Sequence, residues 1–476
     1  MTMPKASPRA LPVAIIGAGP VGLAAAAHLA ERGVPFLLLE AGDAVGAAIR
    51  AWGHVRLFSP WMYNIDRTAG RMLAEAGWTA PEGTALPTGL ELVERYLVPL
   101  SRLDAIGPHL RFGARVSSVG RRDFDKVRTV GREQQPFALR LADGSSVEAR
   151  AVIDASGTWH TPNPVGSGGI GAPGEEALAS RISYGIPDVL GQARAGFADK
   201  RVLVVGSGHS AMNVILDLLT LQDQAPGTKV TWALRRDSLD AVFGGGAADA
   251  LPARGALGTR VRDAVEAGRL QMLMPFRIRA IDADGAALRV TGLLGESEHG
   301  VPVDRIVGAT GFRPDLAMLR EIRLGLDPWL EAPAALAPMI DPNLHSCGTV
   351  RPHGARELAH PERDFFVAGM KSYGRAPTFL MATGYEQVRS IAAALAGDHE
   401  AAARVELDLP ETGVCSAPAE LEAAGGCCGP SAQPEPAETS ASTCCGGPPP
   451  SGVEACCLQD ATAKAAGEAG CGCSAA

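Results

Sequence analysis

The chain has 476 residues, of which 46% are hydrophobic and 20% are charged, and its formal net charge is −8. A chain of this length exceeds one ordinary core, so we expect two or three domains. The acidic balance argues against a nucleic-acid partner, and no stretch reaches the roughly 18 consecutive apolar residues of a membrane span. These bounds leave a globular protein without a membrane segment, which we expect in the cytoplasm.

The first predicted unit spans residues 11–42. An apolar run leads into Gly17, Gly19 and Gly22 in the spacing G-x-G-x-x-G, a helix of small residues follows, and a second apolar run ends on Glu40. The first glycine allows a tight strand-to-helix turn, the second lets the backbone approach a pyrophosphate, and the third lets helix and strand pack closely. The terminal acid can accept hydrogen bonds from a ribose hydroxyl. The pattern predicts a dinucleotide-binding fold and leaves the dinucleotide open.

The next segments predict an irregular stretch, a helix, a hairpin and a buried strand. Residues 41–65 are rich in Gly, Trp and Pro and have poor periodicity, which is typical of a loop that carries function. A helical pattern covers 89–103, and two alternating segments flank the turn at Asp143-Gly144. The run at 151–157 is a buried strand that ends in small residues, and the Pro- and Gly-rich stretch at 158–176 is a plausible linker between domains.

A second unit then repeats the opening pattern. Its turn holds Gly206, Gly208 and Ala211 in the spacing G-x-G-x-x-A, which makes it an internal repeat of a nucleotide-binding unit. Its second strand ends on Arg235 and Arg236 instead of an acid. An arginine there suits the 2′-phosphate of NADP, because its planar fork pairs with phosphate in two-pronged fashion. The alternative is a solvated surface pair.

The end of the chain changes in composition. We expect the segment from 301, with its strand ending in Ala309-Thr310-Gly311, to return to the sheet of the first unit, followed by a last strand and a helix that ends near Gly397. The N-terminus of that helix can point at a flavin. From about 411 onward the chain holds almost no large apolar residues. We expect this tail to be disordered unless its thiols bind something.

Cysteine usage is concentrated in that tail. Of ten cysteines only Cys347 precedes residue 415. Clustered cysteines in a reducing compartment are better interpreted as metal or redox ligands than as disulfides. The candidate ligands for a metal or metalloid are Cys427, Cys428, Cys444, Cys445, Cys456, Cys457, Cys471 and Cys473.

Together the two units resemble the two-dinucleotide-binding-domain flavoproteins, over about residues 11–397. The resemblance implies an α/β fold of two nested Rossmann-like domains: an FAD-binding domain from 1–165 and 301–400, an NADPH-binding domain from 166–300, and a Cys-rich flexible tail from 411–476. It implies FAD contacts from Gly17, Gly19, Pro20, Gly22, Glu40, Trp52, Val116, Gly157, Gly311, Gly369 and Met370. The implied NADPH contacts are Gly206, Gly208, His209, Ser210, Ala211, Arg235 and Arg236.

Two branches of these flavoproteins compete. Disulfide reductases need a redox-active Cys pair beside the flavin, and the body of this chain has only Cys347. Flavin-containing and Baeyer–Villiger-like monooxygenases need none, because NADPH reduces FAD, O2 adds at flavin C4a, and the hydroperoxide hands one oxygen to a soft nucleophile. The chain departs from the FxGxxxHxxx(F/Y) signature of that branch, with ISYGIPDVLG at 182–191 near its place. Met370 also replaces the Asp of the reductases' G-D motif.

A narrower resemblance is to the flavin monooxygenases found with arsenic-resistance genes. The segments HSCGTVRPHG at 345–354 and MKSYGRAPTFLMATGYEQVRS at 370–390 carry it, together with the Cys pairs of the tail. It implies oxidation of arsenite, methylarsenite or antimonite to the pentavalent form with NADPH and O2. Thiolates select soft metals and metalloids, so the tail can capture such a substrate. We expect Cys347 to contact the substrate and Asn64 to steady the hydroperoxide.

Two other functions remain open from the residues alone. One is S- or N-oxygenation of small organic substrates by the same cofactors. The other is a metalloid-sequestering protein whose tail is the main function. The sequence does not indicate the oligomeric state.

Overall fold

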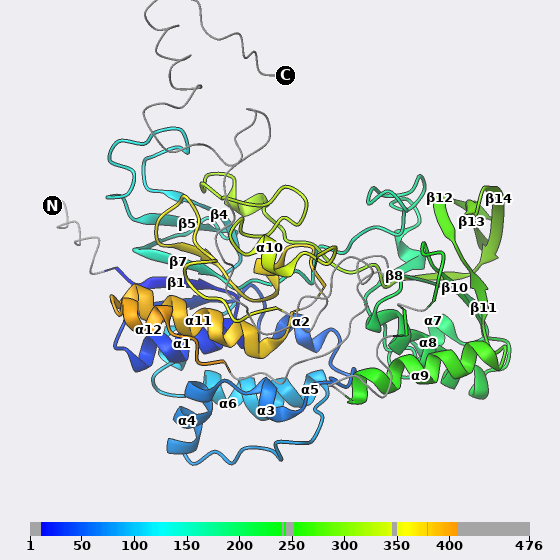
Figure 1. Cartoon of the computed structure of the whole chain (residues 1–476), viewed down its shortest axis with the longest axis horizontal. Coiled ribbons are helices and arrows are strands. Elements are labelled where there is room, and N and C mark those ends of the chain that lie inside the picture. Colours follow the sequence, from blue (N-terminus) through cyan, green and yellow to red (C-terminus); the bar gives the residue numbers. More distant parts are fainter. Residues whose placement is uncertain (1–10, 240–241, 244–251, 345–349, 378, 408–476) are drawn as a thin grey trace, which may run out of the picture. The chain divides into compact units, whose positions relative to one another are not determined.

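The computed structural model describes residues 11–239, 242–243, 252–344, 350–377 and 379–407. Two five-stranded parallel sheets organise these residues, and each is accompanied by a three-stranded antiparallel sheet (Figure 1). The fold is therefore α/β with two dinucleotide-binding units, as the sequence predicts.

The first parallel sheet has the order β16-β7-β1-β2-β3. Its strands are β1 (Val13–Ile16), β2 (Phe36–Leu39), β3 (Leu110–Arg111), β7 (Ala151–Asp154) and β16 (Phe365–Val367). Alternate β1 residues face opposite cores: Val13 and Ile15 pack with the helices, whereas Ala14 and Ile16 pack with the antiparallel strands. Figure 1 shows α1 (Pro20–Glu31), α11 (Met381–Ala396) and α12 (His399–Ala403) together below β1 and β7. The sheet of β4 (Val116–Arg121), β5 (Phe137–Leu141) and β6 (Ser146–Ala149) covers the other face.

Short helices fill the segment between β2 and β3. They are α2 (Ala47–Arg50), α3 (Trp61–Asn64), α4 (Arg67–Glu75), α5 (Gly89–Leu92) and α6 (Val98–Ser101), with a π-helical turn at Val93–Leu97 joining the last two. The predicted helix at 89–103 is thus confirmed, and Thr88 and Glu91 form a capping box at its start. The stretch predicted to be irregular contains α2 and α3, which are four residues each and too short to show a helical period.

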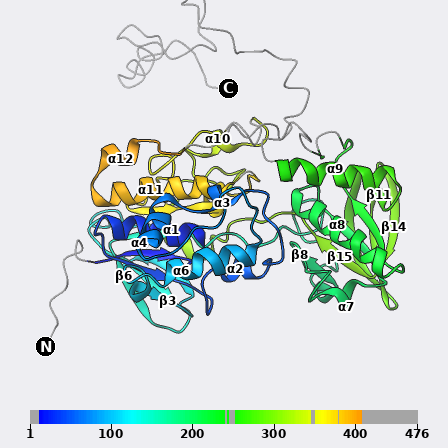
Figure 2. The ribbon, with the colours of Figure 1, turned by 90° about the horizontal axis from the view of Figure 1, so that it is seen from below.

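The second parallel sheet has the order β11-β10-β9-β15-β8. Its strands are β8 (Ile182–Tyr184), β9 (Arg201–Val205), β10 (Lys229–Ala233), β11 (Gln271–Leu273) and β15 (Arg305–Gly308). Helices α8 (His209–Gln224) and α9 (Pro252–Glu266) pack together beside it, as Figure 2 also shows, with α7 (Arg194–Phe197) nearby in the chain. The antiparallel strands β12 (Phe276–Asp284), β13 (Ala287–Leu294) and β14 (Ser297–Val303) share a core with the opposite face.

The strand after residue 301 corrects one expectation. It was assigned to the first sheet, but β15 pairs with β9 and β8 and so completes the second sheet. Gly308 packs there against Tyr184, since a Cβ on it would lie 2.7 Å from that ring. The chain returns to the first unit only after Gly308. Both sheets use buried strands that end in small residues, so the local pattern does not say which sheet such a strand joins.

Other local predictions are confirmed. The hairpin turns at Gly144 with φ +87°, and α11 ends at Gly397 with φ +86°. The linker at 158–176 forms no helix or strand. Among the described residues, no helix is long and apolar enough to cross a membrane. The tail predicted to be disordered lies outside the described residues.

Candidate active site

The first glycine turn joins β1 to α1. Gly17 has φ +98°, and a Cβ on it would lie 2.8 Å from the carbonyl oxygen of Ala155, so this position requires glycine. A Cβ on Gly22 would lie 1.8 Å from Gly17 O, which leaves no room for a side chain. Gly19 has no atom within 4 Å of a Cβ position and is the N-cap of α1, with no side-chain cap and with Pro20 after it. The turn therefore leaves an open backbone cradle at a helix N-terminus, which fits a pyrophosphate.

Glu40 stands at the end of β2 and faces that turn. Its side chain is buried, with 8% exposed, and it accepts N–H bonds from Ala18 at 2.7 Å and Gly42 at 2.8 Å. Each carboxylate oxygen keeps a lone pair for a ribose hydroxyl. Ala114 donates its N–H to Glu40 O, so the segment that enters β4 lies beside this strand end. Val116, two residues later, is buried against Ile16 and Leu39 in the same core cluster.

The carboxyl ends of β7 and β16 lie beside the first glycine turn and form another side of the candidate site. Gly157 has φ +71° and open space at its Cβ position, and Gly369 has φ +70° with Val21 of α1 at 3.2 Å. Lys371 Nζ donates to Asp154 Oδ2 at 2.7 Å and to Ser156 Oγ at 3.1 Å, and both charged side chains are fully buried. This ion pair joins the two strand ends next to the first turn. No sequence motif links these two residues, since they lie 217 positions apart.

An aromatic cluster lies on the two segments that connect the units, one after β7 and the other after β15. The rings of Trp52 and Trp159 lie 6.5 Å apart, and the rings of Trp159 and Phe312 lie 4.9 Å apart. Gly311, the predicted FAD contact on the second connector, has φ +83° and accepts the N–H of Asn163 on the first. Trp52 therefore packs where the connectors meet.

Both polar atoms of the Asn64 side chain make hydrogen bonds within its own loop. It is 1% exposed, its Nδ2 donates to Ser59 O at 2.7 Å and Pro60 O at 3.0 Å, and its Oδ1 accepts the Ser59 hydroxyl at 2.9 Å. Both amide hydrogens are used, so donation to a hydroperoxide requires one of these bonds to break, whereas Oδ1 keeps one lone pair. The predicted role in oxygen chemistry thus stays a prediction, while the structure shows a side chain that holds its own loop.

None of the cysteines lies in the described part of the chain. Cys347 falls within residues 345–349 and the nine others lie beyond residue 407, so the predicted thiol sites are outside the described residues. Within the described residues, no group of three or more His, Cys, Asp or Glu side chains is arranged to hold a metal ion.

The second glycine turn joins β9 to α8 and repeats the first in outline. Gly206 has φ +129°, and a Cβ on it would lie 2.2 Å from Ala309 O. Gly208 has open space at its Cβ position and is the N-cap of α8, which begins with His209 and Ser210. Ala211, at the third position, is fully buried in the core of this unit. This turn therefore also offers backbone amides at a helix N-terminus.

The two arginines after β10 are exposed. Arg235 Nη1 donates to Ser167 O at 2.9 Å, and Arg236 follows it in the loop. Trp232, earlier on β10, donates its ring N–H to Gly206 O at 2.7 Å and ties the strand to the turn. The two guanidinium groups thus come directly after β10, the strand that Trp232 ties to the second glycine turn. This position suits binding of a phosphate on the ribose of a dinucleotide.

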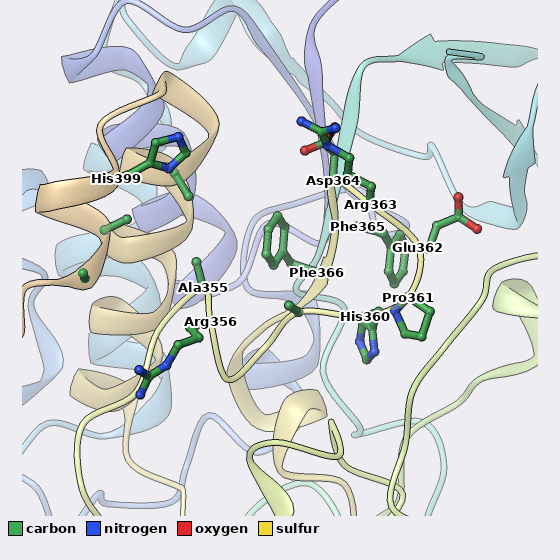
Figure 3. Close-up of a pocket in the computed structure, with 14 residues that line it drawn as sticks. Ala355, Arg356, His360, Pro361, Glu362, Arg363, Asp364, Phe365, Phe366 and His399 are labelled. Atoms are coloured by element: carbon green, nitrogen blue, oxygen red, sulfur yellow. Dashed lines mark ion pairs between the residues drawn. The ribbon is translucent and has the colours of Figure 1, made fainter. Parts of the chain in front are cut away.

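A separate pocket of about 420 Å³ lies at the amino end of β16, away from the carboxyl ends where the first glycine turn sits. Figure 3 shows His399 of α12 on one side and the segment from His360 to Phe366 on the other. Burial lowers the pKa of His360 to about 4, and its Nδ1 accepts the N–H of Gly325. None of the predicted site residues lines this pocket. Its lining residues are Ala355, Arg356, Ala359, His360, Pro361, Glu362, Arg363, Asp364, Phe365, Phe366, Ala394, His399, Ala402 and Ala403.

Comparison with known proteins agrees with this geometry. The ferredoxin–NADP reductase of Thermus thermophilus is 26% identical over 343 residues, which cover 71% of this chain and 84% of that protein. The rice indole-3-pyruvate monooxygenase YUCCA1 is 31% identical over 204 residues, which cover 43% and 44%. The bacillithiol disulfide reductase of Bacillus cereus has the same fold, with a TM-score of 0.60, 18% identity, and coverage of 81% of this chain and 99% of that one.

The family model of the pyridine nucleotide-disulphide oxidoreductases matches residues 11–353, from the first glycine turn through the whole second unit. The chain belongs to the pyridine nucleotide-disulphide oxidoreductase family and is a flavin-dependent oxidoreductase that uses FAD and NADP(H).

Proposed function

We propose that this oxidoreductase is a monooxygenase that oxidises a soft trivalent metalloid, namely arsenite, methylarsenite or antimonite. The metalloid gives up two electrons and gains one oxygen atom from O2. The other oxygen atom leaves as water, with the hydride of NADPH and a proton from solvent. Bound FAD supplies the activation of O2, and the protein supplies placement and a dry site.

The cysteine distribution is the observation that carries this proposal. A disulfide reductase passes electrons through a thiol pair beside its flavin, and this chain has no cysteine before residue 347. Three adjacent pairs follow in the tail, at Cys427-Cys428, Cys444-Cys445 and Cys456-Cys457. Thiolates bind soft ions, and a tethered ligand raises its local concentration at a site it can reach.

The two glycine turns divide the cofactors. We assign FAD to the first turn, where Glu40 is buried and already oriented, and NADPH to the second, where Arg235 and Arg236 follow the strand end. On this assignment the FAD domain consists of residues 1–165 and the part of 301–400 after β15, and the NADPH domain lies between them. Cys347 and the tail cysteines would contact the substrate.

Transfer of electrons from NADPH to a ferredoxin is a second candidate. The observation that favours it is the 26% identity with a ferredoxin–NADP reductase over 84% of that protein. Oxygenation of a small organic molecule is a third, which the similarity to an indole-3-pyruvate monooxygenase favours.

The test follows NADPH consumption, O2 uptake and product formation by the FAD-loaded full chain. Methylarsenite, arsenite, antimonite, a simple sulfide and a ferredoxin are compared as substrates. We expect a metalloid to stimulate NADPH oxidation with equal consumption of O2 and equal formation of the pentavalent product. If no metalloid stimulates it, the proposal is wrong, and ferredoxin reduction without O2 uptake favours the second candidate.

A full-chain variant with the six paired cysteines replaced by Ser tests the tail. We expect it to keep its turnover at saturating metalloid and to need a higher concentration to reach it. Such turnover also argues against sequestration as the main function. A complete loss of turnover in this variant would make the tail part of the reaction site itself.

A further inference from the structure

Gln387 of α11 is a fully buried amide that contacts the loop after β16. Its Oε1 accepts the N–H of Gly369 at 2.8 Å, and its Nε2 lies 2.9 Å from both Ser372 Oγ and His353 Nε2. Gln387 and Ser372 have no exposed surface, and His353 is 3% exposed. A single side chain thus links α11, the Gly369 loop and the segment around His353.

The partners allow only one arrangement of hydrogens. His353 Nδ1 lies 3.0 Å from Arg351 O, and a carbonyl only accepts, so the ring proton sits on Nδ1 and Nε2 is an acceptor. The Ser372 hydroxyl donates to Gly369 O at 2.7 Å, so its oxygen is free to accept. Gln387 therefore donates one N–H to His353 and the other to Ser372, and every polar group of the amide has a partner.

This arrangement holds both peptide groups of Gly369. The N–H of Gly369 is bound by Gln387 and its C=O by the Ser372 hydroxyl, while its backbone keeps φ +70° against Val21 of α1. Gly369 and the next residue, Met370, are both predicted to contact FAD. The orientation of this loop therefore depends on which way the Gln387 amide faces.

We infer that Gln387 and His353 are positioning residues for FAD, with His353 fixing the Gln387 amide so that the Gly369 loop keeps the shape that binds the flavin. The inference rests on the placement of FAD at the first glycine turn. Neither residue needs to touch the cofactor, since the effect passes through the N–H and C=O of Gly369.

Protonation of His353 would disrupt this arrangement. A proton on Nε2 faces the Gln387 N–H, and turning the amide over only moves the clash to the N–H of Gly369. Burial lowers the pKa of His353. The hydrogen bond to Arg351 O and the carboxylates of Glu357 and Glu386 raise the pKa and oppose this shift. The ring centroid of Tyr373 lies 5.7 Å from that of His353. The folded state thus resists the proton that the unfolded chain takes up. The stability that neutral His353 contributes to the fold is therefore complete at neutral pH and is lost on acidification.

The test measures FAD dissociation from the full holoprotein by flavin fluorescence from about pH 8 down to about pH 4, because burial moves the titration of His353 below the usual histidine range. In His353→Gln a side-chain oxygen can replace the Nε2 acceptor without titrating, whereas His353→Leu removes the acceptor. We expect the wild type to bind FAD about tenfold more weakly at the acid end, as for loss of one buried hydrogen bond. His353→Gln should bind like the wild type at neutral pH and lose most of that acid dependence, and His353→Leu should be weak at every pH.

His360→Gln is the matched control, because His360 is also a buried histidine but contacts Gly325 instead of the flavin loop. It should leave the pH profile unchanged. The inference is wrong if His353→Gln keeps the full acid dependence, or if His353→Leu binds FAD as tightly as the wild type at neutral pH. If His353→Leu fails to fold, the comparison of His353→Gln with the wild type still decides. FAD binding is the readout, so either result leaves the metalloid proposal to its own test.

Discussion

The two glycine turns share one backbone plan and differ in what stands around them. Beside the first, Glu40 is buried with two N–H donors and the Lys371–Asp154 ion pair is fully enclosed. Beside the second, Arg235 and Arg236 are exposed. One ion pair of that unit, Arg201–Asp304, is partly exposed and lies at the amino end of β9, the end opposite the turn. A cofactor that stays bound is served by a sealed, preorganised site, whereas one that exchanges at each turnover needs access. The contrast supports FAD at the first turn and NADPH at the second.

The ion pairs offer the largest test of this contrast. Lys371→Met leaves Asp154 as a buried charge without its cation, and we expect a loss of about 3–5 kcal/mol in the free energy of unfolding. Arg201→Met removes an exposed partner from Asp304 and should cost about 1 kcal/mol or less. Urea unfolding of the two variants measures both values. Equal losses would mean that the Lys371–Asp154 pair is no better shielded from solvent than a partly exposed pair.

The third position of each turn gives the next largest effect. Gly22→Ala drives a Cβ into Gly17 O, so the turn must deform and we expect FAD affinity to fall by about 100-fold, or ~3 kcal/mol. The second turn already carries alanine, so Ala211→Gly should change NADPH affinity only a few-fold. Titration of each apoprotein with its cofactor measures this. Tight FAD binding by Gly22→Ala would show that FAD does not bind at the first turn.

The exposed arginines test which nicotinamide cofactor the second turn prefers. Replacing Arg235 and Arg236 together by Ala removes charge-assisted bonds to a 2′-phosphate, worth about 1.5–3 kcal/mol. We expect KM for NADPH to rise about 10- to 100-fold while KM for NADH stays nearly constant. Steady-state kinetics with NADPH and with NADH measure both KM values. An equal rise of KM for both cofactors would mean that the two arginines do not bind a 2′-phosphate.

The smallest effect concerns the carboxyl group of Asp217 on α8, the helix that begins at the second turn. Burial raises the pKa of Asp217 on α8 to about 6, with Asp188 adding to the shift and Arg260 opposing it. The folded state holds this proton where the unfolded chain has lost it, so stability falls as pH rises from about 4 to 6. Asp217→Asn should therefore raise stability near neutral pH by about 1 kcal/mol and flatten the profile. Thermal unfolding across that range measures it, with Asp223→Asn, an exposed partner of Arg269, as the control.

Local signals in the sequence predicted the fold well. The turns at Gly17 and Gly206, the hairpin at Gly144 and the end of α11 at Gly397 each depend on neighbours a few residues away. The sheet that β15 joins could not be predicted, because strands of both sheets end in small residues. The Lys371–Asp154 pair was missed for a similar reason, since it forms between segments far apart in the chain. The role of Asn64 stays a prediction, because the sequence shows its position but not the hydrogen bonds that its amide makes to Ser59 and Pro60.

The distribution of cysteines has a consequence for the proposed metalloid function. Soft trivalent metalloids prefer thiolate ligands. The first 346 residues, which include both glycine turns, contain no sulfhydryl group at all. Under the proposed function, neither glycine turn offers the metalloid a competing thiol, because all ten cysteines lie at or after position 347.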